Sequence, residues 1–107
     1  SLSINQLQSV LEGVSRLDFA VTVHLLGTIH DKRKSSLLLS AWDGRLALVD
    51  LCGRQSLTQT AATLRFCDIA ITGPGASSLL SSGYGTFTIC IDENRILCTT
   101  LTATAIW

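Results

Sequence analysis

The 107-residue sequence has little of what marks several large classes of protein. Lysine plus arginine and aspartate plus glutamate number eight each, so the formal net charge is zero, which argues against strong non-specific nucleic-acid binding. With two Trp, one Tyr and three Phe, the chain has few aromatic side chains for a groove that stacks many bases. No apolar run of about 18 residues and no signal peptide are present, so we expect no membrane partner.

The four cysteines form no Cys-x-x-Cys pair, and each lies in or beside an apolar run: Cys52, Cys67, Cys90 and Cys98. This pattern favours small buried side chains in a reducing compartment over a zinc site or a disulfide framework. We predict that all four thiols are reduced, that at least three are buried, and that no metal or other cofactor is bound.

No catalytic constellation is recognisable either. The two histidines, His24 and His30, are accompanied by no acidic pair and no nucleophile motif. Gly73-Pro74-Gly75 lacks the lysine and the helix-opening context of a phosphate loop, and a plain turn is expected there. The sequence therefore predicts no catalytic residues and no enzymatic activity.

What the chain does have is apolar content. Hydrophobic residues make up 47% and charged residues 15%, which is typical of a folded domain. Residues 1–107 are expected to form a single domain, with 1–17 as an N-terminal helical lead-in. The absence of an initial Met and the abrupt end at Trp107 favour a domain excised from a longer chain.

N-capping residues and the spacing of apolar residues predict two helices. Ser3 and Gln6 have capping-box spacing, and apolar residues recur from Ile4 to Val14 at helical intervals. Residues 56–65 fit a second short helix with Ser56 as its N-cap.

The strands are predicted around a central hairpin. Apolar runs flank Asp43-Gly44 within Leu37–Leu51, and Asp-Gly is the strongest short hairpin signal. Period-two alternation predicts a long first strand from Asp18, bent at Gly27. Further strands are expected at 67–72, 86–91 and, after a turn, 95–99.

This order predicts an all-β fold with short helices, a five-stranded Greek-key barrel of the oligonucleotide/oligosaccharide-binding (OB) type. An α/β fold is the competitor, disfavoured because the Asp-Gly hairpin would make neighbouring strands antiparallel. In an OB barrel the ligand crosses strands two and three between two loops, here the basic 32–34 segment and the 73–85 segment. The residues expected to bind nucleic acid are Lys32, Arg33 and Lys34 for phosphates, Trp42 and Tyr84 for base stacking, and Arg45 and His24 as weaker candidates. For Trp42 a place in the core is equally open.

Residues 17–27 followed by 36–44, with their Leu-Leu-Gly and Trp-Asp-Gly endings, resemble the second OB domain of the telomere end-binding, protection-of-telomeres family. A looser match runs from Phe66 to Leu97. The resemblance implies a nuclear protein of chromosome ends that binds G-rich single-stranded DNA or the proteins of a telomere-capping complex.

Two alternatives remain open. Neutral charge and the leucine-rich Ser78-Leu79-Leu80 segment favour an OB domain used for protein–protein interaction or dimerisation. In addition, Leu51–Leu57 followed by Cys67–Gly75 is similar to the C-terminal, nucleotide-sugar-binding half of heptosyltransferase-like enzymes. A parallel sheet flanked by helices on both faces would end the barrel prediction and favour this second resemblance.

Overall fold

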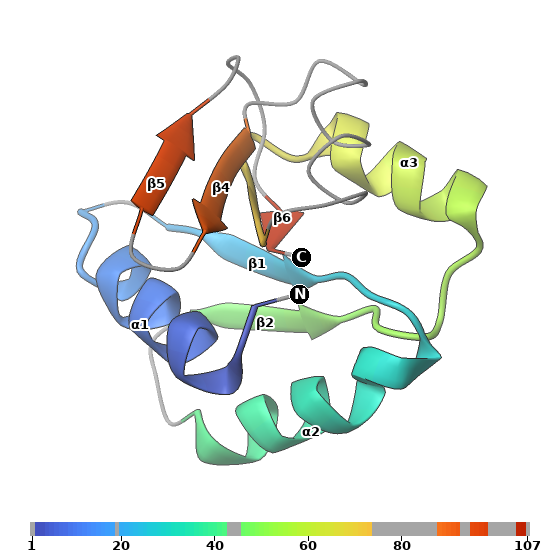
Figure 1. Cartoon of the computed structure of the whole chain (residues 1–107), viewed down its shortest axis with the longest axis horizontal. Coiled ribbons are helices and arrows are strands. Elements are labelled where there is room, and N and C mark those ends of the chain that lie inside the picture. Colours follow the sequence, from blue (N-terminus) through green and yellow to red (C-terminus); the bar gives the residue numbers. More distant parts are fainter. Residues whose placement is uncertain are drawn as a thin grey trace. The chain divides into compact units, whose positions relative to one another are not determined.

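The structure is a computed structural model, and it describes the backbone of residues 2–18, 20–42, 46–73, 88–92, 95–98 and 105–106, with side chains up to residue 73 (Figure 1). The chain divides into two compact units, Leu2–Arg54 and Gln55–Trp107. Each unit is described by itself.

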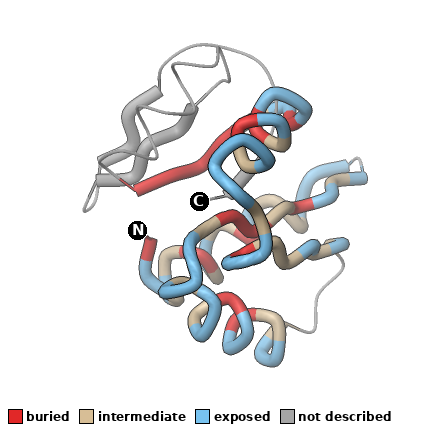
Figure 2. The backbone as a smooth tube through the Cα atoms, turned by 90° about the vertical axis from the view of Figure 1, so that its right-hand side faces the viewer, coloured by how far each residue is buried: buried red, intermediate tan, exposed pale blue. Residues whose placement is uncertain are grey.

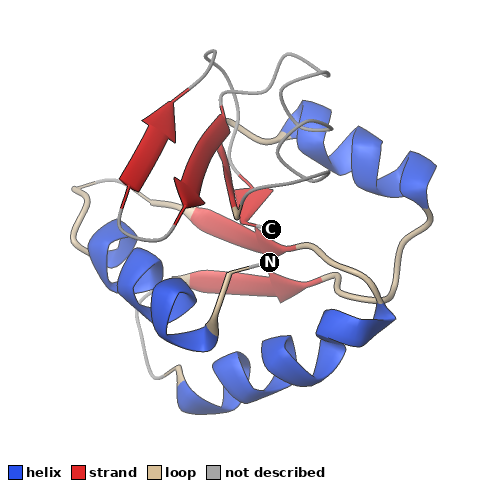
Figure 3. Ribbon diagram, in the orientation of Figure 1, coloured by secondary structure: helices blue, strands red, loops and turns tan. Residues whose placement is uncertain are grey.

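The first unit contains two helices, one 3₁₀ turn and two strands: α1 (Ile4–Ser15), β1 (Thr22–Leu25), η1 (Ile29–Asp31), α2 (Lys32–Ala41) and β2 (Ala47–Asp50). The strands β1 and β2 are parallel, with Thr22 opposite Ala47 and Leu25 opposite Asp50. Parallel neighbours need a long crossover, and α2 supplies it (Figure 3). The first unit is therefore built on a βαβ element.

The helix α1 confirms its prediction from sequence. The Ser3 hydroxyl accepts a hydrogen bond from the Gln6 N–H at 3.2 Å, and the Gln6 side chain accepts one from the Ser3 N–H at 2.9 Å. This reciprocal capping box satisfies two of the donors that a helix start leaves unpaired. Leu7 and Leu11, four residues apart on one face, are buried.

The two faces of the β1–β2 pair differ. Val23 and Leu25 are buried, and they stand opposite Leu48 and Asp50 in the register. Because paired residues of neighbouring strands point to the same side, these four share one face. The Asp50 carboxylate accepts a hydrogen bond from Ser35 of α2, so α2 covers that face.

The second unit contains one helix and four strands: α3 (Leu57–Phe66), β3 (Ala70–Thr72), β4 (Thr88–Asp92), β5 (Arg95–Cys98) and β6 (Ala105–Ile106). Their order is β6-β3-β4-β5, with β3 parallel to both β4 and β6 and with β4 antiparallel to β5. Every residue of β3 is buried (Figure 2), as is usual for the inner strand of a parallel sheet. The helix predicted over 56–65 with Ser56 as its N-cap is confirmed as α3, and the structure adds a capping box between Ser56 and Gln59 that was not predicted.

The predicted barrel is wrong. The described strands form open, mostly parallel pairs alternating with helices, and none of their pairings closes a barrel, so the fold class is α/β. The predicted hairpin fails because residues 37–41 are helical, while β2 pairs in parallel with β1. Gly27 follows β1 in a turn instead of bending a longer strand.

The apolar run of residues 37–39 explains this error. A short run of leucines fits a strand or a helix equally well, and tertiary packing decides between them. Ser35 and Leu38, three residues apart, are both buried on the inner face of α2, while Leu37 is 51% exposed. The Asp43-Gly44 dipeptide, on which the hairpin prediction depended, lies outside the described residues.

Other predictions can be placed directly. Cys52 and Cys67 are free and buried, as predicted, whereas the side chains of Cys90 and Cys98 lie outside the described ones. The predicted turn between strands 86–91 and 95–99 is consistent with the antiparallel β4–β5 pair, in which Asp92 stands opposite Arg95. None of the helices in the described part of the chain is long and apolar enough to cross a membrane.

Candidate functional site

Two turns meet at the carboxyl ends of β1 and β2, the position where open α/β sheets bind their ligands. We call residues 26–31 the β1 turn and residues 51–54 the β2 turn. Two backbone hydrogen bonds tie the β2 turn to this edge: Leu51 N–H donates to the carbonyl of Leu25, the last residue of β1, at 2.9 Å, and Gly53 N–H donates to the Gly27 carbonyl in the β1 turn at 3.0 Å. The two turns therefore form one continuous edge.

The β1 turn is closed by the side chain of Asp31. The Asp31 Oδ2 accepts hydrogen bonds from the Thr28 N–H at 2.9 Å and from the Thr28 hydroxyl at 3.2 Å. A Cβ added at Gly27 would come within 2.7 Å of the same oxygen, so glycine is required for this close approach. Because a carboxylate of the chain already occupies these donors, the backbone of the β1 turn is not an open phosphate cradle.

The β2 turn depends on Gly53. Its φ is +68°, in the left-handed region that only glycine adopts without strain. A Cβ at this position would lie 3.0 Å from both the Cα and the Cδ1 of Ile29 in the β1 turn. The two turns are thus packed directly against each other.

Buried polar groups lie beneath this edge. Asp50, the last residue of β2, accepts the Cys52 N–H on Oδ1 at 3.0 Å and lies 3.0 Å from the Ser35 hydroxyl through Oδ2. The Ser35 hydroxyl also lies 2.9 Å from the Lys32 carbonyl in the first turn of α2. Ser35 and Cys52 are 4% and 3% exposed, so these bonds are shielded from water.

The thiol of Cys52 is unreactive in this setting. Burial, followed by the nearby carboxylate of Asp50, raises its pKa from 9.0 to about 11, although a hydrogen bond with Ser35 acts in the opposite direction. The thiolate is the nucleophilic form of cysteine, and it is scarce at neutral pH when the pKa is raised. The protonated thiol of Cys52 therefore predominates at neutral pH.

The exposed side chains of the edge carry mainly positive charge. Lys32 and Arg33 are exposed in the first turn of α2, and Arg54 is exposed in the β2 turn. The first turn of α2 has no acidic residue, but its N-cap is Asp31, whose negative charge partly offsets these cations at the positive end of the helix dipole. Among the described side chains, no group of His, Cys, Asp and Glu is arranged to hold a metal ion. The described charged side chains of this region are thus three exposed cations together with the hydrogen-bonded carboxylates of Asp31 and Asp50.

Among the described residues expected to bind nucleic acid, the three cations and Trp42 lie at opposite ends of α2. Lys32, Arg33 and Lys34 were predicted in a loop, but they begin α2, and the Lys34 ammonium donates to the Leu2 carbonyl at 2.8 Å. Trp42 follows the last turn of the same helix, about 15 Å away at 1.5 Å per residue. Within the described residues, Trp42 therefore lies apart from the cations that begin α2.

Of the remaining residues expected to bind nucleic acid, the structure describes Trp42 and His24. Trp42 is half-buried, and its indole nitrogen is buried without a hydrogen-bond partner, as is Nδ1 of His24. His24 lies on the face of β1 opposite to Val23 and Leu25, the face turned away from α2. Arg45 and Tyr84 lie outside the described residues, as does the Ser78–Leu80 segment.

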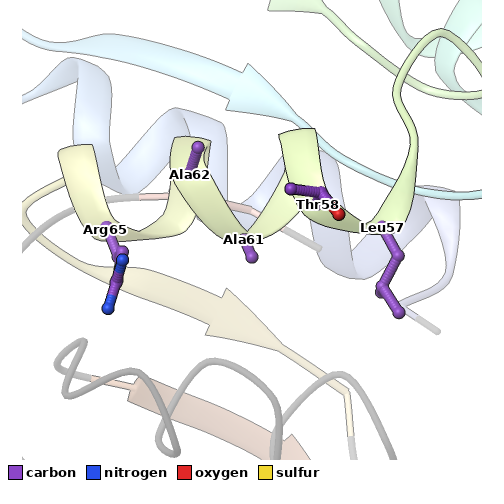
Figure 4. A pocket seen from close by; sticks show the side chains of 5 residues that line it. All are labelled: Leu57, Thr58, Ala61, Ala62 and Arg65. Carbon is purple, nitrogen blue, oxygen red and sulfur yellow. The ribbon is translucent and has the colours of Figure 1, made fainter.

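In the second unit, a shallow hollow of about 290 Å³ runs along α3. Figure 4 shows Leu57, Ala61 and Arg65, at successive four-residue intervals, directed to one side of the helix. Thr58 and Ala62 complete the described lining. This wall offers one guanidinium and one hydroxyl, with no acid–base pair among its described side chains.

Sequence reasoning missed the residues that hold the edge together. A signal was present, because both strands end in the same pattern, Leu25-Leu26-Gly27 and Leu51-Cys52-Gly53, and the structure pairs these two segments through their backbones. Thr28 and Asp31 also have capping-box spacing, which the basic run after them obscured.

Comparison with known proteins adds no assignment, since no protein-family model matches the chain and no curated protein or solved structure matches it significantly.

Proposed function

We propose that this chain is a nucleotide-binding module, the nucleotide-sugar-binding half of a heptosyltransferase-like glycosyltransferase. The observation that carries the proposal is the parallel β1–α2–β2 element with two interlocked glycine turns at its carboxyl end. Open parallel sheets bind nucleotides outside the carboxyl ends of their strands. An OB barrel has no such edge.

The segments that carry the resemblance to these enzymes support the proposal by their context. Leu51–Leu57 runs from the end of β2 through the Gly53 turn to the capped start of α3. Cys67–Gly73 runs from the end of α3 through the buried strand β3. Strand, glycine turn and capped helix follow one another as in nucleotide-binding α/β folds.

The ligand class follows from the charges. Lys32, Arg33 and Arg54 place positive charge at the edge, which suits the diphosphate group of a nucleotide sugar. The contacts would come from side chains, because Asp31 already occupies the donors of the β1 turn. No histidine follows Gly75 in the sequence, so the proposal assigns donor binding to this chain and leaves catalysis out.

Isothermal titration with uridine diphosphate and adenosine diphosphate tests the proposal. We expect saturable binding that weakens with added salt, since phosphate contacts are screened. Lys32→Ala combined with Arg33→Ala should weaken binding. Arg16→Ala is the matched control, because Arg16 is an exposed cation that caps the end of α1, away from this edge. Failure of both nucleotides to bind at low salt contradicts the proposal.

Binding of G-rich single-stranded DNA in the nucleus stays a prediction, now without the barrel that motivated it. A single-stranded telomeric-type oligonucleotide in the same titration distinguishes the two functions. Tighter binding of the oligonucleotide than of either diphosphate would favour the telomeric alternative.

A further inference from the structure

Both oxygens of the Asp50 carboxylate are used to connect separate segments of the first unit. Oδ1 accepts from the Cys52 N–H within the β2 turn, and Oδ2 meets the Ser35 hydroxyl of α2, each at 3.0 Å. Ser35 in turn lies 2.9 Å from the Lys32 carbonyl. One carboxylate thus links the β2 turn to the first turn of α2.

The two segments that Asp50 links also carry the cations assigned to the site. Lys32 and Arg33 belong to the helix turn that Ser35 contacts, and Arg54 belongs to the turn that Cys52 begins. The Gly53 N–H bond to the Gly27 carbonyl joins the β2 turn to the β1 turn. Any displacement of the β2 turn would therefore move Arg54 relative to Lys32 and Arg33.

We propose that Asp50 is a positioning residue for the anion site, holding the β2 turn and the start of α2 in the geometry in which their cations meet one diphosphate. This inference rests on the proposed function and specifies how its site is built. Asp50 acts through its two hydrogen bonds and does not touch the ligand.

A role in positioning and a role through charge have opposite consequences. Removing a negative charge beside an anion site favours binding of the anion. If Asp50 acts only through its charge, every variant with a neutral side chain at position 50 should therefore bind the diphosphate more tightly. A positioning Asp50 predicts loss of binding only when the hydrogen bonds are lost. Asp50→Asn and Asp50→Ala separate these two cases.

The hydrogen bonds allow asparagine to replace aspartate. The amide oxygen of Asp50→Asn can still accept from the Cys52 N–H, and its NH₂ can donate to the Ser35 hydroxyl, which then donates to the Lys32 carbonyl. Alanine can do neither, and it leaves the buried Cys52 N–H without its acceptor.

We expect Asp50→Ala to weaken binding of uridine diphosphate about tenfold, equivalent to about 1.4 kcal/mol, and Asp50→Asn to stay within about twofold of the parent protein. Ser35→Ala, which breaks only the link to α2, should fall between them. Circular dichroism of each variant checks its fold. If Asp50→Ala does not fold, the affinity of Ser35→Ala for uridine diphosphate is the test. An affinity of Ser35→Ala equal to that of the parent protein overturns the proposal. Equal or tighter binding by Asp50→Ala than by the parent protein also overturns it.

Amide hydrogen exchange separates this inference from the proposed function. Asp50→Ala should speed exchange at the Cys52 and Gly53 amides, and Asp50→Asn should not, whether or not a nucleotide binds. If the parent protein binds no diphosphate but the variants show this exchange pattern, the proposed function is refuted. The linkage of the β2 turn to α2 through Asp50 then still stands. Unchanged exchange at both amides in Asp50→Ala overturns the linkage itself.

Discussion

Replacement of Gly53 by alanine should destabilise the protein, because the fold requires a glycine at this position. Gly53 has φ +68°, and the added methyl group would lie 3.0 Å from the Cα of Ile29. The obstacle is backbone, which cannot move aside by a change of rotamer. The substitution therefore strains both turns of the candidate site at once.

The expected cost has two parts. A left-handed conformation costs a residue with a Cβ about 1–2 kcal/mol, and an extra methyl group in a packed site costs about 1–3 kcal/mol. Loss of unfolded-state freedom offsets about 0.4–1 kcal/mol of this. We expect Gly53→Ala to lower the free energy of unfolding by about 1–5 kcal/mol.

Gly13→Ala is the matched control. Gly13 lies within α1, and a Cβ there meets nothing within 4 Å. Alanine should raise the free energy of unfolding by about 0.5–1 kcal/mol because it has the higher helix propensity. Urea denaturation followed by circular dichroism measures both variants. The reasoning is refuted if Gly53→Ala is neutral or stabilising while Gly13→Ala behaves as expected.

Three further predictions concern caps, core and pH. Ser56→Ala should cost about 1 kcal/mol in urea denaturation, because it removes the acceptor for the Gln59 N–H; Ser56→Asp should retain most of the stability. Leu38→Ala should cost about 2–5 kcal/mol, since Leu38 is fully buried, whereas Leu37→Ala on the exposed side of α2 should cost far less. Burial raises the pKa of both Cys52 and Cys67 from 9.0 to about 11, so the folded state holds these protons more tightly than the unfolded state does. Their contribution to stability should therefore be complete below pH 9 and lost as the pH rises to 11, and Cys52→Ala should reduce that slope; an identical slope in the variant would contradict the assignment.

Local signals predicted the helices that carry their own caps. The Ser3–Gln6 capping box and the Ser56 N-cap mark helix starts within four residues of sequence, and the structure shows both caps. The free, buried thiols of Cys52 and Cys67 were also predictable from their apolar surroundings.

The topology was not predictable in this way. An Asp-Gly dipeptide between apolar runs is a strong hairpin signal, but residues 37–41 pack as a helix because Leu38 is buried with Ser35 on one face. The parallel pairing of β1 with β2 joins residues 25 positions apart, such as Thr22 and Ala47, and no local pattern specifies it. The basic residues 32–34 were placed in a loop for the same reason, since charge alone does not distinguish a loop from a solvated helix turn.

The candidate site depends on contacts between distant residues. Asp50 meets Ser35, fifteen positions earlier, only because α2 crosses over the strand pair. The repeated Leu-x-Gly ending of the two strands was visible in the sequence, but its meaning required the parallel register that brings Gly27 and Gly53 together.

The central claim is that a nucleoside diphosphate binds at the joined β1 and β2 turns. Two-dimensional ¹H–¹⁵N NMR with stepwise addition of uridine diphosphate tests it most directly. We expect saturable shifts concentrated at the amides of the two turns and of the first turn of α2, including Thr28, Arg33 and Arg54, and no shifts near Arg16 at the end of α1. Saturating ligand that leaves the amides of both turns unshifted, or shifts confined to other parts of the chain, would contradict it.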